Sequence, residues 1–224
     1  MIHIDINKAL HGSQGDMHLD VNFTVNSGDF VVLMGESGSG KTTLLRILAG
    51  LEDAQGSIEV EGKSWKGIAP QERGIGFVFQ DYALFEHMSV EENLLFVKND
   101  TKLAKELLEM TELSELSSRN VKRLSGGQKQ RVALCRAMMN KPNLLLMDEP
   151  LSALGEKMRR ELQVKIEILH KTFGTTTLMV SHDTESSYAL ADRIIVLEQG
   201  KIVKDGTKDE VLQKENRVLY SLVR

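Results

Sequence analysis

A glycine-rich stretch near the N-terminus has the residue types and spacing of a loop that binds phosphate. Gly35, Gly38 and Gly40 can adopt backbone conformations that other residues avoid, so consecutive N–H groups can surround an anion. Next come an ammonium and a hydroxyl: Lys41 would reach the β- and γ-phosphates, and Thr42 would bind Mg²⁺. The nucleotide-binding candidates are Gly35, Glu36, Ser37, Gly38, Ser39, Gly40, Lys41, Thr42 and Thr43. Residues 35–42 are called the phosphate loop below.

Two acidic residues after an apolar run at 144–147 could complete a site for phosphoryl transfer. Asp148, at the end of the expected strand, can hold Mg²⁺ through water, and Glu149 can orient and deprotonate the attacking water. An Asp-Glu pair alone says little, because most such pairs lie in solvated turns. The phosphate loop upstream favours the catalytic interpretation.

A second motif of the kind that handles phosphate lies at residues 124–128, called the signature segment below. Its members are Leu124, Ser125, Gly126, Gly127 and Gln128. One domain of this size can hardly present both this segment and the phosphate loop to the same ATP. A nucleotide held from two sides, and therefore a partner chain, is implied.

The elements that would position these residues follow from hydrophobic periodicity. The apolar run at 30–34 predicts a buried strand before the phosphate loop, and residues 41–49 predict a helix closed by Gly50. Isoleucines at 2, 4 and 6 and apolar residues from 17 to 25 alternate with polar ones, as in half-buried antiparallel strands. From 81 to 140 the strand signals vanish and leucines follow a helical period, which predicts a helical insertion.

The C-terminal part predicts a return to alternating strands and helices. We expect strands at 76–79, 144–147 and 176–180, a helical face from 158 to 169, and a hairpin of 194–197 with 201–203. Thr207 and Glu210 have capping-box spacing for a last helix. The predicted fold is one α/β domain, 1–224, with a phosphate-loop NTPase core (1–80 and 141–224), an N-terminal antiparallel layer and a helical signature subdomain (81–140).

Composition sets wider bounds. The 224 residues suit one large domain, 41% apolar content is ordinary, and a formal charge of −4 does not indicate a surface that binds polyanions. No apolar run approaches the roughly 20 residues that cross a bilayer, and no secretory leader is recognisable at the N-terminus. Cys135 is the only cysteine, so an internal disulfide is excluded; a small packed thiol is expected.

In the order of its motifs the whole chain resembles the ATP-binding subunits of ABC transporters. The resemblance implies that Gln80 senses Mg²⁺ and the attacking water, and that His182 lies near the γ-phosphate. It also implies an ABC ATPase that needs ATP and Mg²⁺, with Lys41, Gln80, Glu149 and His182 in catalysis and Thr42, Gln80 and Asp148 near the metal. Two copies would sandwich two ATP molecules, the signature segment of each facing the phosphate loop of the other.

Two positions depart from the family pattern. Gly155 stands where the family usually has an aspartate that helps to couple the two sites, so the strength of coupling is in question. A positive φ at Gly155 would be one reason for the glycine. The aromatic residue that commonly stacks on adenine has no clear counterpart between residues 9 and 15; His11 is the nearest planar ring and the candidate.

The segments 80–93 and 148–154 resemble bacterial importers of sugars, polyamines, sulfate and molybdate, with a molybdate-like anion as the first expectation. The implied partners are permease subunits docking between Gln80 and Met88, and a solute-binding protein; nucleic acid is not expected. The implied location is cytoplasmic, on the inner face of the membrane. Some relatives append a β-rich regulatory domain; the sequence ends at Arg224, so regulation by such a domain is not expected.

Two alternatives remain open. An exporter cassette for lipoproteins or peptides would keep the chemistry and reverse the direction of transport. A non-transport ATPase acting on DNA or ribosomes would also share the motifs. DNA-repair members place a very long coiled coil between the phosphate loop and the signature segment, and translation factors usually carry two cassettes; neither feature occurs here.

Overall fold

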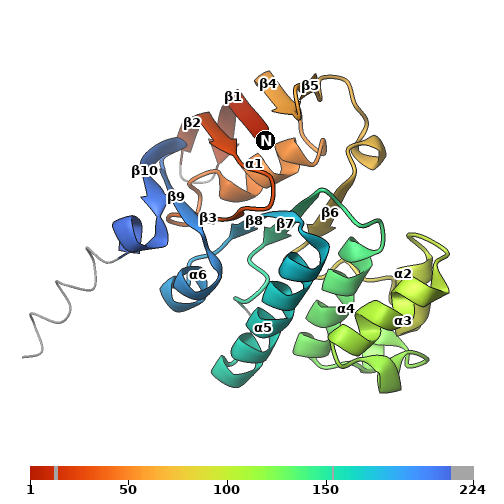
Figure 1. The fold of residues 1–224 in the computed structure, drawn as a ribbon. Coiled ribbons are helices and arrows are strands. Elements are labelled where there is room, and N and C mark those ends of the chain that lie inside the picture. Colours follow the sequence, from red (N-terminus) through yellow and green to blue (C-terminus); the bar gives the residue numbers. More distant parts are fainter. Residues whose placement is uncertain (13–14, 153, 213–224) are drawn as a thin grey trace, which may run out of the picture. The chain divides into compact units, whose positions relative to one another are not determined.

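The structure, a computed structural model, describes residues 1–12, 15–152 and 154–212 (Figure 1). The chain divides into two compact units. The first unit is Met1–Arg73 with the chain from Leu178 onward, and the second is Gly74–Thr177. The second unit contains all of the segment 81–140 that was expected to be a helical insertion.

The first unit is built on a sheet with an antiparallel edge and a buried parallel centre. Its strands run β5-β4-β1-β2-β10-β9-β3-β8 in space. Their bounds are β1 Ile2–Gly12, β2 Gly15–Val25, β3 Phe30–Met34, β4 Gln55–Val60, β5 Lys63–Ser64, β8 Thr176–Val180, β9 Arg193–Glu198 and β10 Lys201–Thr207. The helical elements are α1 Lys41–Leu48, α6 Thr184–Leu190 and the short 3₁₀ turn η1 Pro70–Glu72. β8 begins at the end of the second unit and continues into the first.

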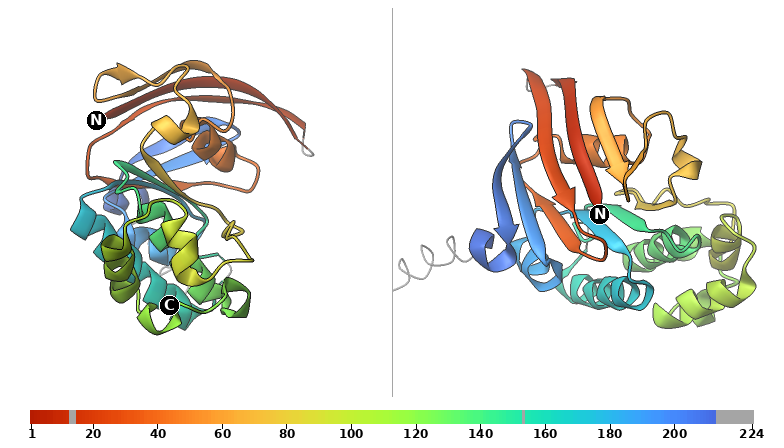
Figure 2. Two further views of the ribbon diagram at one scale, coloured as in Figure 1. Left: turned by 90° about the vertical axis from the view of Figure 1, so that its right-hand side faces the viewer. Right: turned by 45° about the horizontal axis from the view of Figure 1, so that its top comes forward.

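The antiparallel layer follows from the alternation in the sequence. β1 and β2 pair from Ile2 with Val25 to Gly12 with Gly15, and Figure 2 shows them as one long curved hairpin. Ile2, Ile4 and Ile6 are buried while their neighbours are not, because successive side chains point to opposite faces. The predicted half-buried antiparallel strands are confirmed.

The strand before the phosphate loop is buried on both faces. β3 pairs in parallel with β9, Val31 opposite Arg193 and Met34 opposite Val196. Phe30, Val31, Val32 and Leu33 are each at most 1% exposed, as expected for a central parallel strand. α1 begins directly after the loop, so the predicted strand–loop–helix order is confirmed.

The second unit combines a short parallel pair with four helices. Its elements are β6 Ile75–Val78, β7 Leu144–Asp148, α2 Val90–Leu95, α3 Thr101–Met110, η2 Ser114–Leu116, η3 Val121–Arg123, α4 Gly126–Met138 and α5 Glu156–Phe173. β6 and β7 pair in parallel, from Ile75 with Leu144 to Val78 with Met147. α4 contacts α2, α3 and α5 and lies between the last two (Figure 1). Helix α4 is therefore the centre of the helical part of this unit.

The C-terminal capping box forms as predicted. The N–H of Thr207 donates to the Glu210 carboxylate at 2.8 Å, and the Glu210 N–H donates to the Thr207 hydroxyl at 3.4 Å. Residues 208–212 are helical, and the rest of the segment predicted for the last helix lies outside the described residues.

Cys135 is the small packed thiol that was expected. It lies within α4, is fully buried and is 3.1 Å from the Thr111 hydroxyl. Burial raises the pKa of the Cys135 thiol to about 12, because the thiolate would lose its hydration.

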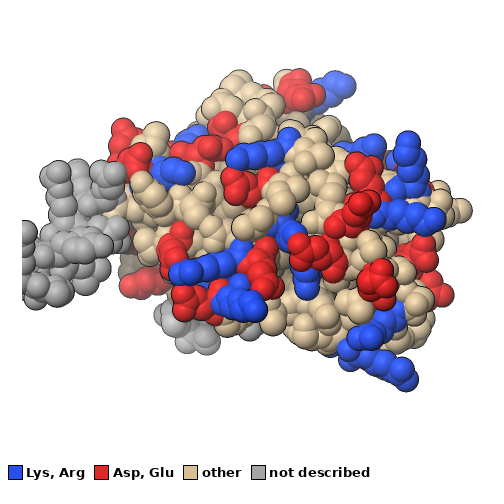
Figure 3. Space-filling view, turned by 60° about the horizontal axis from the view of Figure 1, so that its bottom comes forward, with Lys and Arg blue, Asp and Glu red and all other residues tan. Residues whose placement is uncertain are grey.

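Charged side chains of both signs are interspersed on the face drawn in Figure 3, which shows no broad patch of one sign. On α5 some charged side chains form pairs one helical turn apart. Arg160 is 2.8 Å from Glu156, and Lys171 is 2.6 Å from Glu167. Exposed pairs of this kind support a helix only slightly.

The end of α1 is held by an arginine from outside the helix. The guanidinium of Arg73 donates to the carbonyls of Ile47 and Leu48 at 3.0 and 2.9 Å, and to that of Ile68 at 3.1 Å. The last carbonyls of a helix have no partner within it, so Arg73 satisfies two of them. It also leaves no room for a side chain at Gly50, where an added Cβ would lie 2.7 Å from the guanidinium carbon.

Replacing Arg73 with methionine should therefore destabilise the protein. We expect Arg73→Met to lower the free energy of unfolding by about 1–3 kcal/mol, because each of the three carbonyls loses its bond from the guanidinium, although that of Ile47 keeps the Gly50 N–H. Urea denaturation measures the change. The control is Arg46→Met, which changes an arginine of α1 that forms a half-exposed pair with Glu52 beyond the helix and should cost less than about 1 kcal/mol. Equal losses in the two variants would contradict the capping role of Arg73.

The backbone at Gly155 does not need a glycine. Its φ of −65° and ψ of 158° are those of an ordinary N-cap before α5, so the suggestion of a positive φ is wrong. No atom lies within 4 Å of an added Cβ, and no side chain caps the helix.

Gly155→Asp should consequently be tolerated and should raise the free energy of unfolding by about 0.3–1 kcal/mol. An aspartate there can accept a first-turn N–H and place its charge at the positive end of α5. Gly155→Ala is the control, since alanine fits the space but cannot cap. If thermal denaturation shows both variants equally stable, the uncapped N-terminus of α5 is not a weakness.

Candidate functional site

In the first unit the phosphate loop is organised around the Lys41 ammonium. Lys41 is 6% exposed, and its Nζ donates to the carbonyls of Gly35 at 2.8 Å and Glu36 at 2.7 Å. The Ser39 hydroxyl lies 3.3 Å away. The loop thus wraps round the ammonium at the N-terminus of α1, where backbone N–H groups and the helix dipole favour an anion.

Two glycines of the loop are required for different reasons. Gly35 has a φ of 141°, and an added Cβ would lie 2.1 Å from the carbonyl oxygen of Leu197. Gly40 is the N-cap of α1, with a φ of 98° that an L-residue rarely adopts. Any side chain at Gly35 would push the loop away from β9.

His182 comes to the same sheet edge as the phosphate loop. β3 and β8 are neighbours, and the N–H of Ser181 donates to the carbonyl of Leu33 at 3.1 Å. The ends of both strands therefore meet, with the phosphate loop following one and His182 the other. His182 is exposed, and Asp183 caps α6 by accepting the N–H of Ser186 at 2.8 Å.

In the second unit Gln80, Asp148 and Glu149 share the edge at which β6 and β7 end. Val78 is paired with Met147, so Gln80 and Glu149 each follow that pair by two residues. Asp148 is 6% exposed, Glu149 is half-buried and Gln80 is exposed. The three side chains thus start from one edge, as the carboxyl ends of parallel strands require.

Glu149 has a strained backbone. Its φ is 46°, a left-handed conformation that is uncommon for a residue other than glycine. Its carbonyl accepts the Ser152 N–H at 3.3 Å and the Ser152 hydroxyl at 3.0 Å, which hold the turn. Strain of this kind is frequent where a side chain has a functional position.

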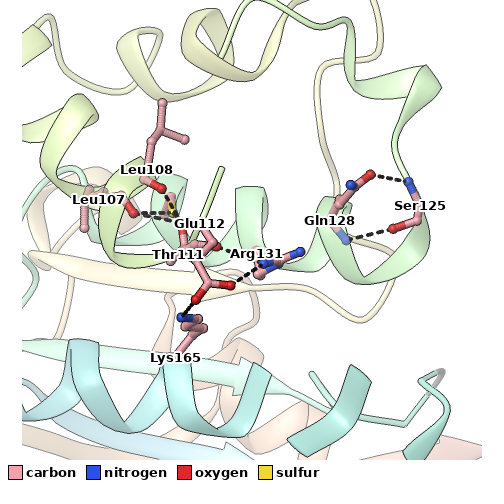
Figure 4. A network of polar contacts seen from close by, with 9 residues as sticks. Leu107, Leu108, Thr111, Glu112, Ser125, Gln128, Arg131 and Lys165 are labelled. Atoms are coloured by element: carbon pink, nitrogen blue, oxygen red, sulfur yellow. Dashed lines mark hydrogen bonds and ion pairs between the residues drawn. The ribbon is translucent and has the colours of Figure 1, made fainter. Parts of the chain in front are cut away.

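The signature segment begins α4 with a capping box (Figure 4). The Ser125 hydroxyl accepts the Gln128 N–H at 3.3 Å, and the Ser125 N–H donates to the Gln128 side-chain oxygen at 2.9 Å. A hydroxyl that accepts this bond keeps its own O–H as a donor. Ser125 and Gly126 are exposed while Leu124 is 7% exposed, so the segment is anchored by its leucine.

Gly127 lies against a methionine of α5. An added Cβ would lie 2.1 Å from the Met158 sulfur and 2.5 Å from its Cγ. Residue types alone do not indicate this contact: Met158 was expected on the buried face of its helix, but it is 38% exposed and covers the signature glycine instead.

A polar network fixes α4 to α3 and α5 (Figure 4). Arg131 of α4 donates to the Thr111 carbonyl at 3.0 Å and lies 3.8 Å from the Glu112 carboxylate, which is 2.6 Å from the Lys165 ammonium of α5. The hydrogen bond from Lys165, followed by its charge, lowers the pKa of Glu112. Glu112 therefore carries its negative charge between two cations.

His11, the candidate for stacking on the base, lies near the end of β1 and stays a prediction. Its ring is 77% exposed and bonded to Asp16 at 2.8 Å. Apolar residues lie beside the phosphate loop: an added Cβ at Gly40 would lie 3.1 Å from Leu19, 3.6 Å from Met17 and 3.7 Å from Leu10. The sequence alone does not indicate this apolar group.

Oxygen donors suited to Mg²⁺ occur in both units, the Thr42 hydroxyl at the start of α1 and the Asp148 carboxylate at the end of β7. Within the described residues, no three His, Cys, Asp or Glu side chains gather as they would around a protein-bound metal. A Mg²⁺ ion that takes phosphate oxygens and keeps several waters needs only one or two protein ligands, and a hydroxyl or carboxylate oxygen of this kind is chemically suitable.

Comparisons with known proteins agree with this geometry. The family described as "ABC transporter" matches residues 19–152. The spermidine/putrescine import ATP-binding protein PotA of Haemophilus influenzae is 43% identical over 203 residues, which cover 87% of this chain and 55% of PotA. The sulfate/thiosulfate import ATP-binding protein CysA of Brucella melitensis is 44% identical over 210 residues, covering 88% and 58%. The chain spans little more than half the length of these relatives.

Among solved structures, the dimeric post-hydrolysis state of the ATP-binding cassette MJ0796, bound to ADP and Pi, superposes with a TM-score of 0.81. It is 28% identical, and the match covers 93% of this chain and 99% of that one. No helix of the described residues has the length and apolar character that crossing a membrane requires. The predicted α/β fold is confirmed, and the chain belongs to the ABC transporter family, with the fold of its ATP-binding cassettes.

Proposed function

We propose that this chain is the ATP-hydrolysing motor subunit of a solute importer. The observation that carries the proposal is the Lys41 ammonium, held by the carbonyls of Gly35 and Glu36 inside a loop at the N-terminus of α1. Such a loop binds the phosphates of a nucleotide. The family and the import ATP-binding proteins among its relatives support the direction of transport.

The proposed reaction is hydrolysis of the terminal phosphate of ATP. The oxygen of a water attacks the γ-phosphorus while the bond to the β–γ bridging oxygen breaks, and the Glu149 carboxylate takes the proton of the water. His182 donates to a γ-phosphate oxygen, and Gln80 orients the water. Mg²⁺, held by Thr42 and Gln80 and through water by Asp148, would neutralise the charge on the phosphates. ADP and phosphate are the products.

The proposed active form is a dimer in which each nucleotide lies between two copies. Ser125, exposed at the N-terminus of α4, would donate its O–H to the γ-phosphate bound by Lys41 of the other copy, and Leu124, Gly126, Gly127 and Gln128 would shape that surface. The dimeric state of the MJ0796 cassette, at 28% identity, supports this arrangement.

We propose that permease subunits dock on residues 80–88, called the docking segment below, on the cytoplasmic face of the membrane. Phe85 and Met88 are half-buried there, and the Phe85 ring is 4.5 Å from that of Phe96, which is 63% exposed. An exposed aromatic group of this kind suits a protein contact. A solute-binding protein would deliver the cargo.

For the cargo we propose a tetrahedral oxyanion, with polyamines as the second candidate. CysA of Brucella melitensis, 44% identical, is named for sulfate and thiosulfate, which supports the oxyanion class to which molybdate also belongs. PotA of Haemophilus influenzae, 43% identical, is named for spermidine and putrescine. Copurifying the complex and measuring its ATP hydrolysis with sulfate, molybdate or spermidine distinguishes the two. Stimulation by spermidine alone would overturn the oxyanion proposal.

Glu149→Gln tests the chemistry. The variant should keep its affinity for ATP and lose roughly 10²–10⁴-fold in hydrolysis, the usual contribution of a positioned general base. Phosphate release measures hydrolysis, and a fluorescent ATP analogue measures binding. Glu156→Gln, an exposed glutamate on the first turn of α5, is the control and should hydrolyse ATP normally. Hydrolysis by Glu149→Gln at the rate of that control would remove Glu149 from the proposed role.

Mixed dimers test whether the site is shared. Lys41→Ala chains and Ser125→Arg chains should each be inactive alone, while their heterodimer has one doubly damaged site and one intact site and should recover part of the activity. Differently tagged chains allow the heterodimer to be isolated. A heterodimer of wild-type and Lys41→Ala chains shows whether one intact site suffices. If that control is active and the mixed dimer is not, the signature segment does not act across the interface.

A further inference from the structure

Two consecutive residues of the docking segment have a strained backbone. Tyr82 has a φ of 66° and Ala83 a φ of 47°, both in the left-handed region and neither a glycine. They follow Gln80 by two and three residues. Non-glycine residues keep such conformations only where the surrounding structure holds them. The contacts that hold this pair therefore also fix the path of the chain after Gln80.

One arginine of α4 binds both strained residues. The guanidinium of Arg136 donates to the Ala83 carbonyl at 2.6 Å and to the Tyr82 carbonyl at 3.1 Å. The planar fork of an arginine can serve two adjacent carbonyls at once, which the ammonium of a lysine does less well. Partial burial of the Arg136 guanidinium lowers its pKa, because the charged form loses hydration.

The same arginine touches the aromatic group of the docking segment. Its guanidinium carbon lies 5.4 Å from the centroid of the Phe85 ring. The backbone of Phe85 is held as well: its N–H donates to the Asn93 side-chain oxygen at 2.9 Å, and its carbonyl accepts from the Asn93 amide at 3.2 Å. Asn93 lies in α2 and is 0% exposed. The docking segment is thus fixed between α2 and α4 by buried or half-buried polar groups.

A second contact joins the docking segment to the start of α4. A Cβ added to Gly126 would lie 3.4 Å from the Tyr82 hydroxyl, so the tyrosine side chain reaches the signature segment. Arg136 lies in the last turn of α4. Tyr82 and Ala83 are therefore held through Arg136 near the end of α4, and the Tyr82 side chain also reaches the start of α4, which Ser125 caps.

We propose that Arg136 is a positioning residue, which holds the docking segment to α4 so that a shift of residues 82–85 moves the signature segment with it. The inference rests on the proposed function, in which the docking segment meets the permease and Ser125 meets ATP. The physical reason is that α4 is rigid and contacts the docking segment near both of its ends, so the helix and the segment should move together. Arg136 itself does not touch nucleotide in this scheme.

Arg136→Lys tests the contact while keeping the positive charge. In the isolated subunit, amide hydrogen exchange across residues 82–88 should accelerate, because the two carbonyls lose their fork of donors. ATP affinity should stay within about twofold of wild type. Arg131→Lys is the matched control: it changes an arginine of the same helix that binds the Thr111 carbonyl instead. Unchanged protection of residues 82–88 in Arg136→Lys would overturn the inference.

The complex with its permease tests the consequence. Solute-stimulated ATP hydrolysis by Arg136→Lys should fall at least about fivefold, the lower range of a coupling between sites, with the change in kcat rather than in the KM for ATP. Arg131→Lys should keep more of the stimulation at matched thermal stability. If exchange accelerates but stimulation is unaltered, Arg136 is structural only and the inference fails. If the wild-type complex shows no stimulation by any solute, the proposed motor function fails first.

Discussion

The hydrogen bonds of the Lys41 ammonium are the interaction on which the nucleotide site depends. A lysine that is 6% exposed would be unfavourable without partners, and the carbonyls of Gly35 and Glu36 provide them. Those carbonyls can turn inward only because Gly35 lies against the backbone of β9, where no side chain fits. The buried pair of β3 and β9 thus helps to determine the shape of the phosphate loop.

In the second unit several helices and loops are held in place without a large sheet. Polar contacts to backbone carbonyls hold them, from Arg131 to Thr111 and from Arg136 to Tyr82 and Ala83. Both arginines belong to α4. Side chains of α4 that bind backbone carbonyls can therefore fix the orientation of this helix between α3 and α5. Every residue has a backbone carbonyl, so these contacts depend less on the identity of the neighbouring residues than close apolar packing would.

Much of the fold could be predicted because it is encoded locally. The alternation of Ile2, Ile4 and Ile6 with polar residues and the apolar run at 30–34 both predict strands, because the spacing of buried residues can be read directly from a sequence. The contacts of Arg136 could not be predicted, since they join residues 54 positions apart, and residue type does not reveal a positive φ at Tyr82. The apolar residues beside Gly40 could not be predicted either, because strand pairing brings them there, and the stacking role of His11 stays a prediction.

The buried thiol of Cys135 has a practical consequence. Burial raises the pKa of this thiol to about 12, so the thiolate, which is the form that reacts, is scarcely populated at pH 8. The side chain is also fully covered within α4. It is the only cysteine of the sequence, so thiol reagents should react little with this folded chain. A single cysteine introduced at an exposed position could carry a spectroscopic label without any change to the native residue.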